Sequence, residues 1–386
     1  MTLADAHPTP PHTLPMEHDR APHGPSRLPD APPDAVVRLG LGLRRAILRL
    51  ADAVVPPELA LFDRTVGSGR TAMLGAVARW RIPDLLGDVG LTADELAART
   101  GASADALHRV LRALAHDGVF CLGADGRWRN NRVSSAMRAG NGLRMRHWAM
   151  YWASRANQRT WMAVDHALRT GGGAYREANG VGVWEWFDAH PDERACFAEA
   201  MAGLTAQSAG GVAARYPFAE AGSVCDVGGG RGLLLSEVLL RHPHLRGVVC
   251  DNAGLAPMAK EIFEARGVAD RAGFVAGSFF ESVPEGHDVY LFKNILHDWG
   301  DAECVRILAT VRRAMRPGAR VLVVEHLLDR DDVGNPAALA DVMMMLTCDG
   351  GRERDAGEFA ALFERAGLRA GRTFPSALEA LLEAVA

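Results

Sequence analysis

Residues 297–353 contain side chains that could carry out acid–base chemistry. His297 opens a His-Asp-Trp triplet directly after an apolar run that is expected to form a strand. Glu325 ends the next such run, and Glu353 follows in Gly-Gly-Arg-Glu. Ligands of open α/β sheets bind beyond the carboxyl ends of the strands, so this placement suits a functional site. A lone histidine here would be taken for a surface residue at a loop or a helix N-terminus, so its role depends on the residues that accompany it.

A glycine-rich turn marks a second site. Asp226-Val-Gly228-Gly-Gly230-Arg-Gly232 follows an apolar strand, and its glycines let a ligand approach the backbone closely. The turn alone is a weak signal, because nicotinamide, flavin and methyl-donor enzymes all use one. A dinucleotide site needs a small residue at the next position, where this chain has Leu233, so that class is disfavoured.

Asp251 ends the following strand, at a distance that suits a carboxylate binding both ribose hydroxyls of an adenine nucleoside. Capping or loop solvation is the alternative role. Because Asp226 and the glycine run precede Asp251 in this order, the ribose role is favoured.

Strands and helices alternate from residue 223 onward, which predicts a mostly parallel sheet covered on both faces. The expected strands are 223–227, 247–251, 274–276, 289–293 and 321–325. The expected helices are 233–240, 258–265 and 303–315, and residues 359–386 add a further amphipathic helix and two short strands.

The chain divides into four predicted regions. Residues 1–35 are rich in Pro and His with few large apolar side chains, so we expect a disordered tail. Residues 36–140 form a winged-helix-like domain, 141–215 a helical connector and 216–386 the α/β domain. The connector is dense in aromatic side chains, which belong to a core or line a pocket for a flat ligand.

The winged-helix pattern rests on local signals. Thr92 and Glu95 form a capping box for a helix that ends at Gly101, a second helix begins near Ser103, and two short strands are expected over 119–122 and 127–129. Such a shape also occurs in DNA-binding proteins, with Arg109 and Arg112 on the outer face of the second helix. No basic cluster surrounds them, so packing against a partner subunit is favoured.

Composition sets further limits. The 43 basic and 47 acidic side chains nearly balance, which gives no reason to expect a nucleic-acid partner. The six cysteines form no CxxC pair and no metal cluster is apparent, so we expect reduced thiols and no metal. With neither a signal peptide nor a membrane span visible, a cytoplasmic protein is expected.

From about Leu59 to the C-terminus the chain resembles the plant-type small-molecule O-methyltransferases. This family includes caffeic acid and flavonoid O-methyltransferases and bacterial enzymes that methylate antibiotics and pigments. The most specific parts of the resemblance are the 226–232 loop, the block from Lys293 to Trp299, and the glutamates Glu325 and Glu353 in this order.

The resemblance implies a Rossmann-like sheet of seven strands with the last pair reversed, an N-terminal dimerisation domain that makes a homodimer, and S-adenosylmethionine as methyl donor. His297 would be the general base that takes a proton from the acceptor hydroxyl, and Glu325 and Glu353 would orient its imidazole. The residues implied to bind the cofactor are Asp226, Gly228, Gly230, Asp251, Ser278, Phe279, Lys293 and Trp299. Among them Gly228 and Gly230 would contact the methionine moiety, Asp251 the ribose and Trp299 the adenine.

Two departures from the family pattern affect the cofactor contacts. The family usually has Gly-Asp after the third strand, and its acid binds the adenine amino group, whereas this chain has Gly277-Ser278. A serine accepts a hydrogen bond without bringing charge. Asp251 is followed by Asn252-Ala253 in place of the family's Leu-Pro, which implies a different loop shape.

Three alternatives remain open at this stage. The same scaffold supports methyl transfer to nitrogen or carbon, and some relatives are hydroxylases that keep the cofactor. A winged-helix regulator that senses a small ligand is the third. The acceptor itself is not fixed by the sequence; carotenoid hydroxyls, phenazines, anthracyclines and quinones all fit the bacterial branch.

Overall fold

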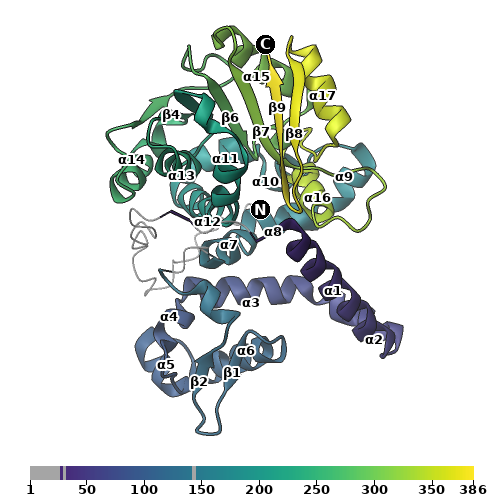
Figure 1. The fold of residues 1–386 in the computed structure, drawn as a ribbon. Helices are drawn as coiled ribbons and strands as arrows, with labels where there is room; N and C mark the ends of the chain where they lie inside the picture. The colour runs from purple at the N-terminus through teal and green to yellow at the C-terminus, as the bar shows by residue number, and fades with distance from the viewer. Residues whose placement is uncertain (1–26, 29–31, 141–144) are drawn as a thin grey trace. The chain divides into compact units, whose positions relative to one another are not determined.

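The computed structural model describes residues 27–28, 32–140 and 145–386 (Figure 1). These residues form two compact units, and each unit combines segments that are not contiguous in the sequence. One contains residues 56–154, apart from 141–144, together with 199–203; the other contains the described part of 23–55, then 155–198 and 204–386. The predicted tail lies mostly outside the described residues, and helix α1 already begins at Asp34.

The first unit is helical with a small hairpin. Its elements are α2 (Pro57–Thr65), α3 (Gly67–Arg79), α4 (Ile82–Leu86), α5 (Ala93–Thr100), α6 (Ala104–His116), β1 (Phe120–Leu122), β2 (Trp128–Asn130), the 3-10 turn η1 (Ser134–Met137) and α7 (Met145–Trp152). The predicted helix, turn, helix and antiparallel hairpin are therefore all present.

Local capping explains where α5 begins and ends. The Thr92 hydroxyl accepts from the Glu95 N–H at 3.2 Å, and the Glu95 carboxylate accepts from the Thr92 N–H at 2.8 Å, which confirms the predicted capping box. The helix ends at Gly101, whose φ of 73° suits glycine. In α6 the side chains of Leu107, Leu111 and Leu114 are buried, as their spacing predicts.

A seven-stranded sheet organises the second unit, in the order β5-β4-β3-β6-β7-β9-β8. Its strands are β3 (Ser223–Val227), β4 (Arg246–Asp251), β5 (Ala272–Ala276), β6 (Val289–Lys293), β7 (Arg320–His326), β8 (Arg369–Phe374) and β9 (Glu379–Val385). The first five are parallel. The last pair is reversed in order, because β9 lies between β7 and β8, and β9 pairs antiparallel with both.

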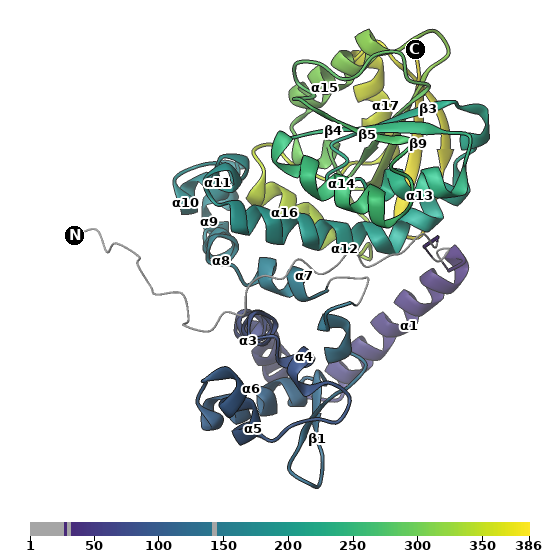
Figure 2. The ribbon, with the colours of Figure 1, turned by 90° about the vertical axis from the view of Figure 1, so that its left-hand side faces the viewer.

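Helices cover both faces of this sheet. The helices of the unit are α1 (Asp34–Ala53), α8 (Arg155–Met162), α9 (Val164–Thr170), α10 (Tyr175–Asn179), α11 (Val183–Ala189), α12 (Pro191–Arg215, of which five residues belong to the first unit), α13 (Leu233–Arg241), α14 (Ala256–Ala265), α15 (Asp301–Ala314), α16 (Ala338–Thr347) and α17 (Ala356–Arg365), with 3-10 turns η2 (Phe218–Glu220), η3 (Ala253–Leu255) and η4 (Leu296–Asp298). Figure 2 shows α13 and α14 in front of the sheet and α15 and α17 behind it. None of the described helices is long and apolar enough to cross a membrane.

Leu28 corrects the expectation of a fully disordered tail. Its side chain is 4% exposed, its N–H donates to the Glu237 carboxylate at 2.9 Å, and its carbonyl accepts from Arg241 at 3.0 Å. Glu237 on α13 is itself fully buried and pairs with the buried guanidinium of Arg266. One apolar side chain and two charge-assisted hydrogen bonds thus anchor a segment whose composition alone favours disorder.

Candidate active site

The carboxyl end of β3 leads into the glycine loop, residues 228–232. Gly228 and Gly230 have φ values of 71° and 56°, in the left-handed region that favours glycine. A side chain at Gly228 would also collide with Ile295, whose Cδ1 lies 2.5 Å from the ideal Cβ position, whereas no atom lies within 4 Å of that position at Gly230. The backbone at Gly230 is therefore open to a ligand.

Two carboxylates lie against this loop. Asp251 accepts from the Gly230 N–H at 2.8 Å and from the Asn252 N–H at 2.6 Å. Burial raises the pKa of Asp251, although these two N–H groups oppose the shift. Asp226 is buried under Gly229 with one carboxylate oxygen lacking a partner, and burial together with Asp251 raises the pKa of Asp226 to about 7.

Aromatic rings connect the glycine loop to the end of β6. Phe279 lies 3.7 Å from the ideal Cβ position of Gly228 and meets Trp299 edge to face, with 6.1 Å between ring centres. Phe280 also meets Trp299 edge to face, with 4.7 Å between ring centres. The Ser278 hydroxyl accepts from the Phe280 N–H at 3.3 Å, so it serves the local turn.

His297 lies in η4, just after β6, and is buried among carboxylates. Its Nδ1 is 2.9 Å from Glu353 Oε1 and 3.5 Å from Glu325 Oε2. Its Nε2 is 3.7 Å from Asp298 Oδ1. Because both glutamates face Nδ1, the neutral imidazole carries its proton there and donates to Glu353, which leaves Nε2 as the accepting atom. The structure thus brings together the three residues predicted as catalytic.

The neighbouring carboxylates favour the protonated form of this imidazole. Burial lowers the pKa of His297, but Glu325, Asp298 and Glu353 outweigh it and raise the pKa to about 10. Glu325 is held in place by the N–H groups of Ile295 and Leu296, at 3.0 and 2.9 Å from its Oε1. Burial and the neighbouring acids raise the pKa of Glu325. Burial likewise raises the pKa of Asp298 to about 6.

Arg354 fixes the loop that carries His297, a role that the sequence analysis missed. Its guanidinium donates to the carbonyls of Leu296 at 3.0 Å and Trp299 at 2.8 Å, and to Asp301 at 2.8 Å. The side chain is 1% exposed. The signal in the sequence was an arginine directly after Glu353, in Gly-Gly-Arg-Glu-Arg. Exposed arginines occur in the same pattern, so the sequence does not show that Arg354 is buried.

Lys293, implied to contact the cofactor region, is held in a buried ion pair. Its ammonium lies 2.6 Å from Glu379 at the start of β9, and both side chains are buried. Although burial opposes ionisation, Lys293 lowers the pKa of Glu379 to about 2. Asn294, with a φ of 53°, also donates to Glu379 at 3.3 Å. Glu379 was not among the predicted site residues, since it follows Lys293 by 86 positions.

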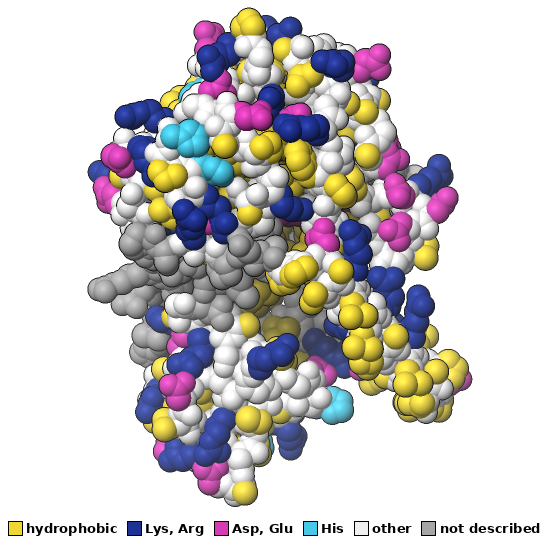
Figure 3. All heavy atoms as spheres, in the orientation of Figure 1, with side chains coloured by type: hydrophobic (Ala, Val, Ile, Leu, Met, Phe, Trp, Pro, Cys, Tyr) yellow, Lys and Arg dark blue, Asp and Glu magenta, His cyan; other side chains and the backbone are white. Residues whose placement is uncertain are grey.

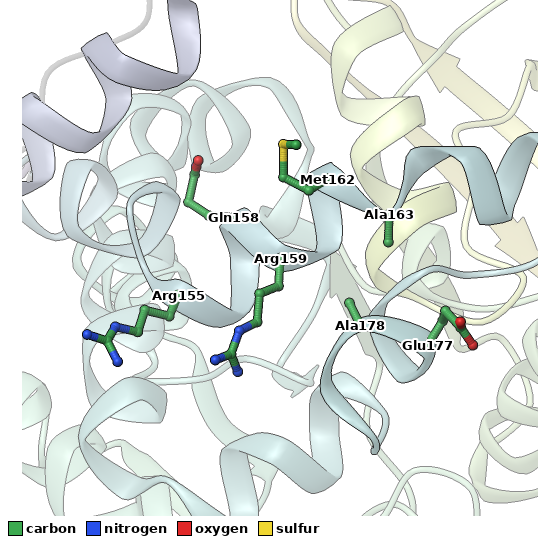
Figure 4. A pocket seen from close by; sticks show the side chains of 7 residues that line it. All are labelled: Arg155, Gln158, Arg159, Met162, Ala163, Glu177 and Ala178. Carbon is green, nitrogen blue, oxygen red and sulfur yellow. The ribbon is translucent and has the colours of Figure 1, made fainter. Parts of the chain in front are cut away.

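A hollow of about 550 Å³ lies on α8 and α10, and none of the predicted site residues lines it (Figure 4). It is shallow and open to solvent. Its walls are Arg155, Gln158, Arg159, Met162, Ala163, Glu177 and Ala178.

The fold and this constellation define a class of enzyme. Residues 161–369 match the family model of the O-methyltransferase domain, and residues 65–139 match that of the O-methyltransferase dimerisation domain. The chain therefore belongs to the O-methyltransferase family.

Particular relatives are similar over most of their length. The mitomycin biosynthesis 6-O-methyltransferase of Streptomyces lavendulae is 38% identical over 82% of this chain and 91% of its own. The crystal structure of LaPhzM superimposes with a TM-score of 0.82 at 34% identity, covering 86% of this chain and 99% of that one. NcsB1 from neocarzinostatin biosynthesis, solved with S-adenosylmethionine and 2-hydroxy-5-methyl naphthoic acid, gives a TM-score of 0.71 at 33% identity, covering 82% and 95%.

Proposed function

We propose that this enzyme transfers the methyl group of S-adenosylmethionine to a hydroxyl of an aromatic or polycyclic metabolite, with His297 as general base. The observation that carries the proposal is the buried contact of His297 with Glu353 and Glu325, at the end of the strand next to the glycine loop. Ligands of such sheets bind at this edge.

The residues around the glycine loop fit the methyl donor. Gly230 offers open backbone to the amino-acid end, Asp251 offers a carboxylate to the ribose, and Trp299 with its neighbouring rings offers an apolar surface to the adenine. Asp226 supports the same assignment, because its buried and unpaired oxygen calls for a donor. S-adenosylmethionine supplies an electrophilic methyl group, which leaves orientation and proton removal to the protein.

His297 performs the proton removal in this proposal. A phenol with a pKa near 10 is mostly protonated at neutral pH, and Nε2 accepts its proton as the oxygen attacks. The carboxylates that raise the pKa of His297 to about 10 stabilise the imidazolium that forms. They also keep most of the imidazole protonated at neutral pH, so the fraction that can accept a proton grows as the pH rises.

The relatives suggest the acceptor class. One is named for mitomycin biosynthesis, and NcsB1 was solved with a hydroxynaphthoic acid. We therefore propose a fused-ring phenol or hydroquinone as acceptor. The test is incubation of the enzyme and S-adenosylmethionine with a panel of hydroxynaphthoates, hydroxyphenazines and the matching aryl amines, with mass spectrometry to locate the added 14 mass units. Methylation of amines alone would replace oxygen by nitrogen as the target, and a gain of one oxygen would indicate a hydroxylase.

A homodimer belongs to the same proposal. The dimerisation family model covers residues 65–139. Helix α1 also has no buried side chain and exposes an apolar stripe of Leu39, Leu43, Ile47 and Leu50 (Figure 3). Light scattering at micromolar concentration should give twice the chain mass of 41.4 kDa. The double variant Leu43→Asp, Ile47→Asp should shift it toward the monomer.

A further inference from the structure

An aromatic contact outside the proposed mechanism joins α11 to the end of β6. The rings of Trp184 and Trp299 lie 6.1 Å apart between centres, with planes 21° apart. A distance of 6.1 Å between ring centres lies within the range of offset-stacked aromatic pairs. Trp184 is 37% exposed, although the rings behind it are buried or partly buried.

The orientation of Trp184 is fixed from behind. Phe187 and Phe197 lie 6.2 and 6.3 Å from it, tilted by 57° and 72°. The Gly182 N–H donates to Glu185 at 3.0 Å and so fixes the start of α11. Trp184 therefore presents its indole to Trp299 as a supported surface rather than as a loose side chain.

The other rings that contact Trp299 connect it to the glycine loop. Phe279 and Phe280 meet Trp299 with planes 79° and 84° away from its own, and Phe279 lies beside Gly228. A planar group that extends from the glycine loop toward Trp299 accordingly also comes close to Trp184, which stacks on Trp299.

We propose that Trp184 is part of the binding site for the adenine ring of the methyl donor, as a second aromatic surface beside Trp299. The inference rests on the proposed function, since it presumes that an adenosyl group occupies the glycine loop. It adds a residue from the helical connector to a site otherwise built by the ends of β strands. Cofactor binding then also depends on α11, whose Trp184 stacks on Trp299.

Affinity for two adenosyl ligands tests the proposal. S-adenosylhomocysteine and 5′-methylthioadenosine share the adenosine group, and only the first has the amino-acid tail. Calorimetry on Trp184→Ala should give dissociation constants that rise about five- to tenfold for both ligands, as loss of one aromatic contact predicts. Trp184→Phe should keep most of the affinity. Equal loss for both ligands places the contact on the nucleoside.

Trp186 supplies the matched control on the same helix. Its indole stacks on His190 at 3.8 Å and donates to Glu193 at 3.1 Å, away from Trp299. Trp186→Phe should bind both ligands as the parent enzyme does. If Trp184→Ala does not fold, Trp184→Leu keeps the apolar volume, removes the aromatic face and should show the same loss.

Three outcomes would overturn the inference: unchanged affinity for both ligands, a loss confined to S-adenosylhomocysteine, or an increase in the acceptor KM alone, which would assign Trp184 to the acceptor. Failure of the parent enzyme to bind S-adenosylhomocysteine is a different result, because it would remove the proposed function itself.

Discussion

Nδ1 of His297 lies 2.9 Å from Oε1 of Glu353, and no water separates two buried groups at that distance. The contact fixes both the tautomer and the plane of the imidazole. It also leaves Nε2 as the only ring nitrogen free to accept a proton from an acceptor molecule.

Removal of the imidazole should separate catalysis from cofactor binding. His297→Ala should lower kcat by about a hundredfold or more, as expected for loss of a general base, while the dissociation constant of S-adenosylhomocysteine changes less than about twofold. Asp251→Ala is the converse variant and should weaken that ligand by about tenfold, since a charged hydrogen-bond partner is lost. Stopped assays with calorimetry give both numbers. Equal loss of ligand binding in the two variants would contradict this division of roles.

Activity should rise with pH, and Glu353 should control where it rises. In the proposed mechanism His297 accepts a proton only when Nε2 is unprotonated. Because the carboxylates raise the pKa of His297 to about 10, kcat/KM should increase as pH increases toward that value. Glu353→Gln removes one of these charges and should move the acidic limb of the profile down by about one pH unit. The profile of kcat/KM against pH measures it. An acidic limb at the same pH in both proteins would show that Glu353 does not tune the base.

The loop around His297 should depend on Arg354. Arg354→Met would remove the guanidinium that donates to the buried carbonyls of Leu296 and Trp299 and pairs with Asp301, which should cost about 3 kcal/mol of unfolding free energy. Urea denaturation measures this. Arg365→Met is the control, because Arg365 reaches the same Asp301 only at 3.8 Å from an exposed position and should change stability by less than about 0.5 kcal/mol. A similar loss in both variants would contradict the role of Arg354.

Chelation should leave the reaction unchanged. The ligand atoms of His297, Glu325 and Glu353 lie within 4.8 Å of one another, which is close enough for a metal ion. However, Nδ1 donates a hydrogen to Glu353 in the proposed base, and a nitrogen that donates a hydrogen does not ligate a metal. Turnover after dialysis against EDTA should therefore equal that of untreated enzyme. Loss of activity that zinc or magnesium restores would make this cluster a metal site.

The sequence predicts the parallel half of the sheet well, because its strands are short apolar runs between helices. The ends of β3 and β6 agree with the predicted residues, and those of β4 and β7 within a residue. The placement of β9 between β7 and β8 was expected only from the family resemblance and is confirmed, whereas helix α16 was not predicted. Strand order depends on contacts between distant segments, and a Met-rich apolar run does not distinguish a helix from a strand.

The site residues also differ in whether the sequence could predict them. His297, Glu325 and Glu353 could be named from motifs and do converge. Arg354 and Glu379 could not, because each acts through a partner that folding brings near. The roles of Arg354 and Glu379 depend on their burial, and an arginine or a glutamate is usually exposed, so the residue type does not reveal it.

The anchored leucine at position 28 bears on how the protein is best produced. The composition of residues 1–33 suggests that they could be removed. That truncation would remove the Leu28 N–H that donates to Glu237 and the Leu28 carbonyl that accepts from Arg241, and it would expose one side of the Glu237–Arg266 ion pair to solvent. A shortened enzyme of this kind should melt about 1 to 3 °C below the intact chain, as a loss of about 1 to 2 kcal/mol implies for a protein of this size. A start site upstream of Arg27 avoids this loss.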